Sequence, residues 1–254
     1  MNYKASIEQT KQGFEESFRV GAYYNKQTRD DMHLELILGY IQVESGMRIL
    51  DLGTGSGYLA FPFADKYKQV EVVGLDIVEK TLEENQRKAE LTGINNLRFV
   101  SYDGMDFPFD DNSFDIVITR YALHHFPAIN DTFREISRVL KKNGVFFLSD
   151  PTPNDDDVER FVDEYMQMKK DGHIKFYTKD EWKKMGCSVD LMYIDGFQTI
   201  IRFPRKKETA LEFDDIISRH NEAVIRGYEV EIIEDEIWIS EKVNNLIFRN
   251  NKQL

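Results

Sequence analysis

Cysteine is nearly absent from this sequence, because Cys187 is the only one among 254 residues. A single thiol cannot form an internal disulfide, and without Cys-x-x-Cys or paired Cys and His spacings a structural zinc site is excluded. We therefore expect no bound metal. A chain with so little cysteine suits a reducing compartment, and we expect a cytoplasmic protein.

Long apolar runs are also missing. The first twenty residues interleave apolar positions with charged ones such as Lys4, Glu8, Lys11 and Arg19, so they lack the apolar core of a signal peptide. No later run approaches the length that crosses a bilayer. We expect no membrane segment.

Positive charge is scarce. The 33 Lys and Arg residues face 45 Asp and Glu residues, which leaves a net charge of −12. Such a surface repels phosphate backbones, and the dense basic cluster at residues 202–207 is more typical of a solvated surface loop. We expect a small-molecule substrate and no binding of nucleic acid. These properties are compatible with a homodimer.

The composition is otherwise that of an ordinary globular protein, with 41% hydrophobic and 31% charged residues. Helices are predicted over residues 5–20 and over residues 30–43, where Asp30 supplies the N-cap. Short apolar strands then alternate with amphipathic helices, with strands over 47–52, 70–76, 97–100, 114–119 and 145–149, and helices over 58–67, 78–91 and 131–140. This alternation predicts a doubly wound, Rossmann-like α/β core that binds ligands at the carboxyl ends of its strands.

Beyond Asp150 this rhythm breaks at the polar stretch 151–157, and the rest of the chain is richer in aromatic residues. Strand-like runs are predicted at 191–203 and 229–248, with a helix over 209–228 between them. We divide the chain into an N-terminal helical lid at residues 1–45, a cofactor-binding core at 46–151, and a cap with late strands at 152–254.

The strongest motif runs from Ile49 to Tyr58, where a strand ends in Asp51 and a Gly53-Thr-Gly-Ser-Gly57 turn precedes a helix. Glycines let the backbone approach a ligand closely, and the start of a helix presents free N–H groups to an anion. A tight turn without a ligand is the alternative interpretation, and acids at the ends of the next two strands argue against it.

The ligand of this turn is not expected to be a dinucleotide. A dinucleotide-binding turn has glycine at the third position of its register, which Tyr58 occupies here, and Asp51 would bring a carboxylate near the pyrophosphate. A cofactor with a free ammonium and a carboxylate fits better, because Asp51 can favour the ammonium while backbone N–H groups bind the carboxylate. S-adenosylmethionine has both groups.

Two further aspartates follow strands. Asp76 can accept hydrogen bonds from both hydroxyls of a ribose, and Asp103 can accept one from the amino group of adenine. A lone aspartate after a strand is usually a cap or turn residue. Three at successive strand ends favour a cofactor site.

Together, ILDLGTGSG, VVGLDI, SYDGMDFPFDDNSFDIV and ISRVLKKNGVFFLSDP resemble the successive motifs of class I S-adenosylmethionine-dependent methyltransferases. The resemblance covers residues 47–151 and is to the branch related to quinone-biosynthesis C-methyltransferases and to uncharacterised bacterial small-molecule methyltransferases. It implies a seven-stranded, mostly parallel sheet with an antiparallel last strand. By motif position, it implies cofactor contacts at Asp51, Gly53, Gly55, Asp76, Asp103 and Gly104. The expected contacts also include Thr54, Gly57, Ile77, Met105 and Arg120.

The segment after the fourth strand departs from better-known relatives. It reads Thr119-Arg-Tyr-Ala-Leu-His-His-Phe126 where enzymes that methylate nucleic-acid amino groups resemble Asn-Pro-Pro-Tyr, which disfavours a base as the acceptor. Quinone enzymes usually carry another segment here, which disfavours a quinone. His125 or His124 can act as general base, since imidazole titrates near neutrality; the alternative is that one packs and the other is hydrogen-bonded to a backbone carbonyl. Tyr24, with Tyr23, can close over the sulfonium or can simply be core.

Two functions are alternatives to a methyltransferase. Tyr165 and Lys169 have the Tyr-x-x-x-Lys spacing of a nicotinamide-dependent oxidoreductase, but the glycine turn starts too late in the chain and has the wrong register for that family. A non-catalytic S-adenosylmethionine-binding module is the other rival.

Overall fold

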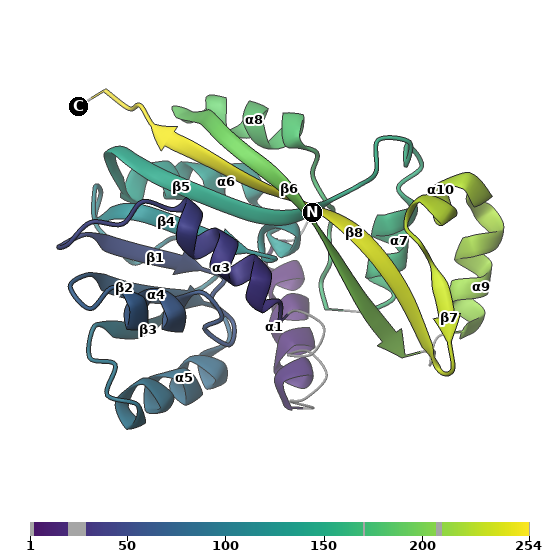
Figure 1. The fold of residues 1–254 in the computed structure, drawn as a ribbon, viewed down its shortest axis with the longest axis horizontal. Coiled ribbons are helices and arrows are strands. Elements are labelled where there is room, and N and C mark those ends of the chain that lie inside the picture. The colour runs from purple at the N-terminus through teal and green to yellow at the C-terminus, as the bar shows by residue number, and fades with distance from the viewer. Residues whose placement is uncertain (1–2, 20–28, 170, 207–209, 254) are drawn as a thin grey trace.

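The computed structural model describes residues 3–19, 29–169, 171–206 and 210–253 (Figure 1). Tyr23 and Tyr24 therefore lie outside the described residues. In the part of the chain that is described, no helix is long and apolar enough to cross a membrane.

An eight-stranded sheet organises the described part of the chain. Its continuous path has the order β3-β2-β1-β4-β5-β8-β6, and β7 pairs with β8 beside this path. Neighbours from β3 to β5 are parallel, whereas β8 is antiparallel to both β5 and β6. The strands are β1 (Arg48–Leu52), β2 (Glu71–Asp76), β3 (Leu97–Ser101), β4 (Phe114–Arg120), β5 (Leu140–Thr152), β6 (Leu191–Lys206), β7 (Glu231–Ile233) and β8 (Glu236–Asn250).

Helices cover both faces of this sheet, which confirms the doubly wound α/β prediction. One hydrophobic cluster lies between the sheet and α3, α4 and α5, and a second lies between the sheet and α6 and α8. Because both faces are buried, the parallel strands consist of nearly continuous apolar residues. The helices are α1 (Tyr3–Arg19), α3 (Asp31–Tyr40), α4 (Ala60–Lys66), α5 (Glu79–Leu91), α6 (Ile129–Val139), α7 (Phe161–Gln167), α8 (Lys179–Cys187), α9 (Ala210–Arg219) and α10 (Glu222–Gly227), with a 3-10 turn η1 (Leu123–His125).

Local sequence signals explain some of the element ends. Asp30 caps α3 as predicted, because its side chain accepts a hydrogen bond from His33 N at 2.9 Å. The predicted strand 229–248 is instead a hairpin, β7 and β8, because the acidic pair Glu234 and Asp235 forms a turn inside the apolar run. This hairpin adds an eighth strand to the seven that were expected.

Two other predictions of local structure were wrong. The helix expected over 209–228 divides into α9 and α10, because Asn221 begins a new helix by accepting a hydrogen bond from Ala223 N. The strand expected at 145–149 runs from 140 to 152 and includes Pro151, which was expected to end it. Pro151 is tolerated because the pairing of β5 with β4 stops at Ser149, so that only β8 is hydrogen-bonded to this end of β5.

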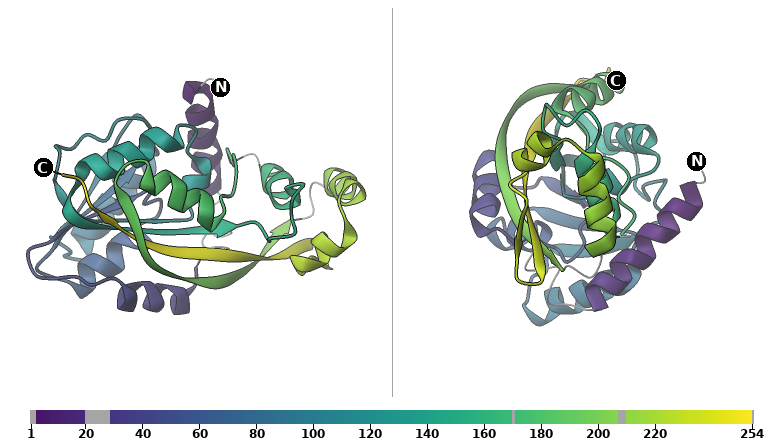
Figure 2. Two further views of the ribbon diagram at one scale, coloured as in Figure 1. Left: turned by 90° about the horizontal axis from the view of Figure 1, so that it is seen from above. Right: turned by 90° about the vertical axis from the view of Figure 1, so that its right-hand side faces the viewer.

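The long strands β6 and β8 extend past the parallel core and carry a third hydrophobic cluster with α7, α9 and α10 (Figures 1 and 2). Figure 2 shows these three helices grouped at one end of the molecule, opposite α4 and α5.

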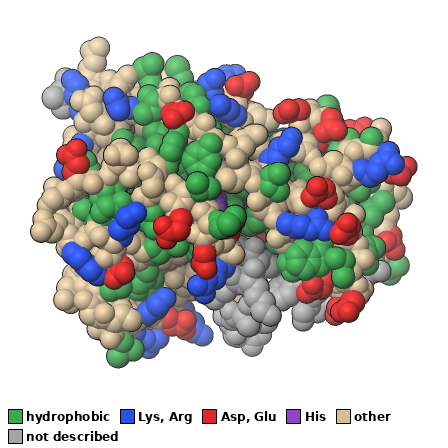
Figure 3. Space-filling view, viewed as in Figure 1, with side chains coloured by type: hydrophobic (Ala, Val, Ile, Leu, Met, Phe, Trp, Pro, Cys, Tyr) green, Lys and Arg blue, Asp and Glu red, His purple; other side chains and the backbone are tan. Residues whose placement is uncertain are grey.

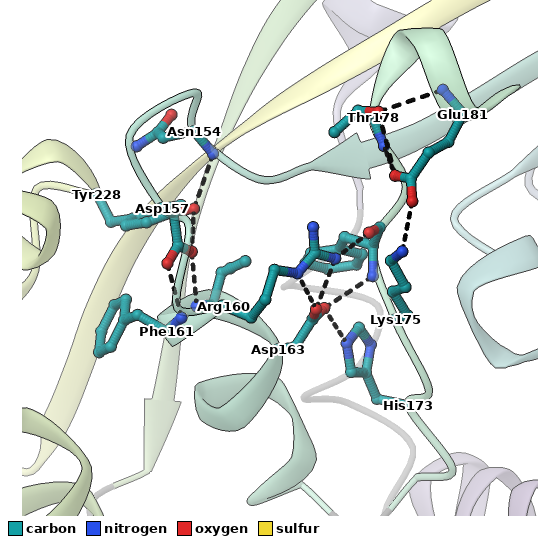
Figure 4. A network of polar contacts seen from close by, with 12 residues as sticks. Asn154, Asp157, Arg160, Phe161, Asp163, His173, Lys175, Thr178, Glu181 and Tyr228 are labelled. Carbon is teal, nitrogen blue, oxygen red and sulfur yellow. Dashed lines mark hydrogen bonds and ion pairs between the residues drawn. The ribbon is translucent and has the colours of Figure 1, made fainter. Parts of the chain in front are cut away.

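Hydrogen bonds fix the segment that leads from β5 through α7 to α8 (Figure 4). Asp157 accepts from the backbone N–H groups of Phe161 and Val162 at 2.7 and 3.1 Å and from the hydroxyl of Tyr228 at 2.7 Å. Asp163 accepts from the imidazole of His173 at 2.9 Å and from Phe176 N at 2.7 Å. A capping box of Thr178 and Glu181 starts α8, a helix that the sequence pattern did not predict.

Candidate functional site

A cavity of about 940 Å³, including its open mouth, lies at the carboxyl ends of β1, β2 and β4. The residues predicted as cofactor contacts that line it are Asp51, Gly53, Thr54, Gly55, Asp76, Ile77, Gly104 and Arg120. Side chains that were not predicted as contacts complete its walls, among them Ile7 and Phe14 of α1 and Tyr58, Tyr121, Phe126 and Pro127. The first cavity thus lies at the edge of the sheet where ligands bind in folds of this kind.

The glycine turn forms the floor of this cavity. Gly53 has φ +68°, a left-handed conformation that favours glycine, and a Cβ added there would lie 2.5 Å from Cβ of Ala122. The turn is anchored to the neighbouring strand because the N–H groups of Gly53 and Thr54 both donate to the carbonyl of Leu75, at 2.8 and 3.1 Å. The turn after β1 therefore packs directly against the segment after β4.

Asp51 lies beneath this turn and is only 2% exposed. Its Oδ2 accepts hydrogen bonds from the hydroxyl of Thr54 at 2.7 Å and from Ala60 N at 3.1 Å. Burial raises the pKa of Asp51 to about 7 in spite of these bonds. A cationic group placed beside this carboxyl favours its ionised form, so the site suits an ammonium.

Asp76 ends β2 and faces the same cavity. Its two oxygens accept from Gly55 N at 2.8 Å and from Val78 N at 3.0 Å, which ties the glycine turn to the loop after β2. Burial raises the pKa of Asp76. Each carboxylate oxygen can accept a second hydrogen bond, so Asp76 keeps capacity for ligand hydroxyls.

Three other predicted contacts do not line the cavity. Asp103 is exposed, and its Oδ1 accepts from Met105 N at 2.9 Å and from Asp106 N at 3.1 Å, so that it shapes its own turn. Met105 follows in that turn. A Cβ at Gly57 would lie 2.6 Å from the ring of Phe61, so this glycine allows α4 to pack against the turn.

Arg120 brings a positive charge to the cavity. Its guanidinium carbon lies 4.1 Å from the ring centre of Tyr58 and 3.8 Å from that of Tyr121, and its Nε donates to Nδ1 of His33 at 3.3 Å. The other ring nitrogen of His33 is hydrogen-bonded to Oδ1 of Asn245 at 2.8 Å. The guanidinium of Arg120 and the carboxyl group of Asp51 thus line one cavity.

The two candidate base residues, His124 and His125, sit on η1 with ring centres 4.1 Å apart. Burial lowers the pKa of both imidazoles well below the ordinary value. His124 is hydrogen-bonded through Nδ1 to Oδ1 of Asp150, and burial raises the pKa of Asp150 to about 8. Nδ1 of His125 has no hydrogen-bond partner among the described residues.

A second cavity of about 490 Å³ adjoins the first. Phe14, Tyr121 and His125 line both cavities, whereas His124 lines only the second. Phe14 of α1 packs edge-on against His125 with ring centres 5.0 Å apart. Segments far apart in sequence therefore meet at one wall between the two cavities.

The residues of the oxidoreductase alternative lie elsewhere. Tyr165 is fully buried in the third hydrophobic cluster, against Phe161 and Phe213, and it lines neither of these cavities. Lys169 lines the second cavity and forms an ion pair with Asp171 at 3.0 Å. The Tyr-x-x-x-Lys spacing therefore does not place this pair at the glycine turn. In the described ranges, no group of three His, Cys, Asp or Glu residues is arranged to hold a metal ion.

A family model described as a methyltransferase domain matches residues 43–190. Among curated proteins, the uncharacterized methyltransferase YcgJ of Bacillus subtilis is 34% identical over 163 residues, which are 64% of this chain and 64% of that protein. A demethylmenaquinone methyltransferase of Geobacillus kaustophilus is 31% identical over 112 residues, which are 44% of this chain and 48% of that protein. The chain thus spans less than two thirds of the length of these curated relatives.

Solved structures agree with the fold. The crystal structure of YcgJ superposes with a TM-score of 0.76 at 25% sequence identity. The match covers 88% of this chain and 100% of that chain. A putative methyltransferase from Bacillus halodurans has a TM-score of 0.75 at 22% identity, with 87% and 100% coverage.

Proposed function

Because this chain belongs to the methyltransferase-domain family, we infer that it is an S-adenosylmethionine-dependent methyltransferase, and we propose that its acceptor is a small molecule bound in the second cavity. The observation that carries the proposal is the wall of Phe14, Tyr121 and His125 that the two cavities share. Group transfer needs the reacting atoms about 3 to 3.5 Å apart and in line, so donor and acceptor sites must adjoin.

The residues of the first cavity fit the cofactor. We propose that Asp51 binds the ammonium group of the cofactor, Arg120 its carboxylate and Asp76 its ribose hydroxyls. All three residues line the cavity whose floor is the glycine turn. Asp103 stays a proposed partner of the adenine amino group, from the turn between the lining residues Tyr102 and Gly104. The bound cofactor supplies the electrophilic methyl group.

The protein contributes alignment, exclusion of water and a proton acceptor. Helix α1 lies over the first cavity through Ile7, Thr10 and Phe14, and we propose that residues 1–45 act as a lid. We propose His125 as the general base because its side chain lines both cavities and its lowered pKa keeps the imidazole uncharged. Its lowered pKa leaves the imidazole neutral and ready to accept a proton, although it makes the base weak.

We further propose that the enzyme works in the cytoplasm and does not bind nucleic acid. On the face drawn in Figure 3, acidic and basic side chains alternate, and its described residues form no continuous basic stripe. The net charge of −12 supports the same interpretation. A homodimer stays a prediction.

Calorimetry with S-adenosylhomocysteine tests the cofactor site, and transfer of labelled methyl groups to components of a metabolite extract tests the reaction. We expect binding and at least one labelled product. A folded protein that binds no S-adenosylhomocysteine contradicts the proposal. Once an acceptor is known, His125→Ala should lower single-turnover rates by about 10² to 10⁴-fold, whereas a loss below about tenfold assigns His125 to packing or positioning.

A further inference from the structure

Glu241 is an acid at a position where the strand pattern calls for an apolar residue. It lies on β8 between the fully buried inward residues Ile239 and Val243, and it is itself 1% exposed. Its side chain lines the second cavity, and its Oε1 has no hydrogen-bond partner among the residues described. A buried carboxyl without a partner is costly, so this position is not explained by stability alone.

Apart from its two histidines and the ion pair of Lys169 with Asp171, the rest of the second cavity is lined by apolar and aromatic side chains. Pro151, Met166, Phe176, Ile201 and Phe203 all line it, and Glu241 pairs in register with Ile201 on β6. Aromatic faces attract cations, and apolar walls exclude water from a charge held at their end. The cavity therefore suits an apolar body with one charged or strongly polar group.

The charges around Glu241 determine the sign of that group. Of the nearby cations, Lys169 pairs with Asp171 at 3.0 Å, whereas Arg205 is hydrogen-bonded to the carbonyl of Tyr165 at 2.6 Å and its charge favours the ionised form of Glu241. Asp150 adds a second acid whose Oδ2 has no partner in the described chain. The charged groups that act on Glu241 are Arg205 from β6, Asp150 from β5, Asp163 from α7 and Lys169 from the segment after α7.

We propose that Glu241 is a specificity-determining residue that binds a protonated amino group of the acceptor, so that the acceptor is an apolar or aromatic amine. This inference rests on the proposed function, because it takes the second cavity as the acceptor site. In this proposal the methylated atom would lie at the other end of the cavity, where Tyr121 and His125 line both cavities.

Binding of matched probes to the protein saturated with S-adenosylhomocysteine tests this assignment. The probes are 2-phenylethylamine and hexylamine as amines, 2-phenylethanol as the neutral match, and phenylacetate as the anionic match. We expect calorimetry to show binding of at least one amine, at least about tenfold weaker binding of the alcohol, and no binding of phenylacetate. Failure of both amines, or preference for phenylacetate, overturns the proposal.

Two further measurements separate recognition from structure. Glu241→Gln should weaken amine binding about 10- to 100-fold and leave the affinity for S-adenosylhomocysteine unchanged, whereas Glu222→Gln, at an exposed position in the same C-terminal region, should change neither. Unchanged amine affinity in Glu241→Gln contradicts the assignment.

Proton release by the wild-type protein decides the matter even if Glu241→Gln does not fold. Burial raises the pKa of Glu241 to about 8, so an ammonium that ionises it at pH 7 should displace most of one proton. Calorimetry in two buffers of different ionisation enthalpy measures this release, and amine binding without release contradicts the proposal. Absence of S-adenosylhomocysteine binding would instead contradict the proposed function.

Discussion

Gly53 and Gly93 are a matched pair for testing whether the turn after β1 must remain in close contact with the segment after β4. Both have left-handed backbones, with φ +68° and +70°. An alanine at either position therefore costs about 1 to 2 kcal/mol of strain. Only Gly53 adds a collision, because its new Cβ would lie 2.5 Å from Cβ of Ala122, whereas a Cβ at Gly93 meets no atom within 4 Å.

The expected magnitudes follow from this difference. Gly93→Ala should lower the free energy of unfolding by about 1 to 2 kcal/mol and leave the affinity for S-adenosylhomocysteine intact. Gly53→Ala should lower the free energy of unfolding by about 1 to 3 kcal/mol more than Gly93→Ala does. The additional loss is due to overpacking, because the turn or the segment at Ala122 must shift. Since that turn is the floor of the first cavity, the same shift should weaken S-adenosylhomocysteine by at least about tenfold, a cost of 1.4 kcal/mol.

Urea unfolding and calorimetry measure the two effects separately. Equal losses of stability in Gly53→Ala and Gly93→Ala would show that Ala122 yields without cost. Wild-type affinity for S-adenosylhomocysteine in folded Gly53→Ala would refute the close approach of this turn to the cofactor.

Three other perturbations have defined outcomes. Asp76→Ala should weaken S-adenosylhomocysteine by about 1.5 to 3 kcal/mol in calorimetry, the range for a hydrogen bond to a charged group, and wild-type affinity in a folded variant would remove the ribose assignment. Asp157→Ala removes the acceptor of three hydrogen bonds and should lower the free energy of unfolding, measured by urea titration, by about 2 to 4 kcal/mol. Asp156→Ala, at the exposed neighbouring position, should lie within about 0.5 kcal/mol of wild type in the same measurement. Scanning calorimetry of the cofactor-free protein should show a falling unfolding temperature between about pH 6.5 and 8.

That most of the proposed cofactor contacts line one cavity could be predicted, because they are close together in sequence. Asp51 and the glycine turn belong to one strand and one loop, and Asp76 stands at the end of the next strand. In a parallel sheet such strand ends meet at one edge, so spacing alone brings the residues together. Asp103 shows the limit of this rule, because a carboxylate at a strand end can fold back onto its own turn.

The second cavity, the proposed acceptor site, could not be predicted in the same way. Its wall joins Phe14 of α1 to His125 of η1, and its far end is Glu241 of β8, so long-range packing determines which residues meet. The sequence does carry one usable signal, an acid in the inward register of the apolar strand from Ile237 to Val243. What that acid faces depends on α7, which the aromatic-rich stretch after Asp150 did not reveal.

The fall in stability above pH 6.5 follows from proton linkage at the two cavities. Burial raises the pKa of Asp51 to about 7 and those of Asp150 and Glu241 to about 8, whereas the unfolded chain ionises these groups near pH 4. Between pH 4 and these values the folded state binds more protons, so stability decreases as pH rises. His124 and His125 act in the opposite direction, since their lowered pKa values make stability rise until the unfolded histidines lose their protons near pH 6.5. Above that pH the carboxyl groups act unopposed, and Glu241→Gln should make the fall shallower. A flat wild-type profile from pH 6.5 to 8 would show that these carboxyl groups are already ionised in the folded protein.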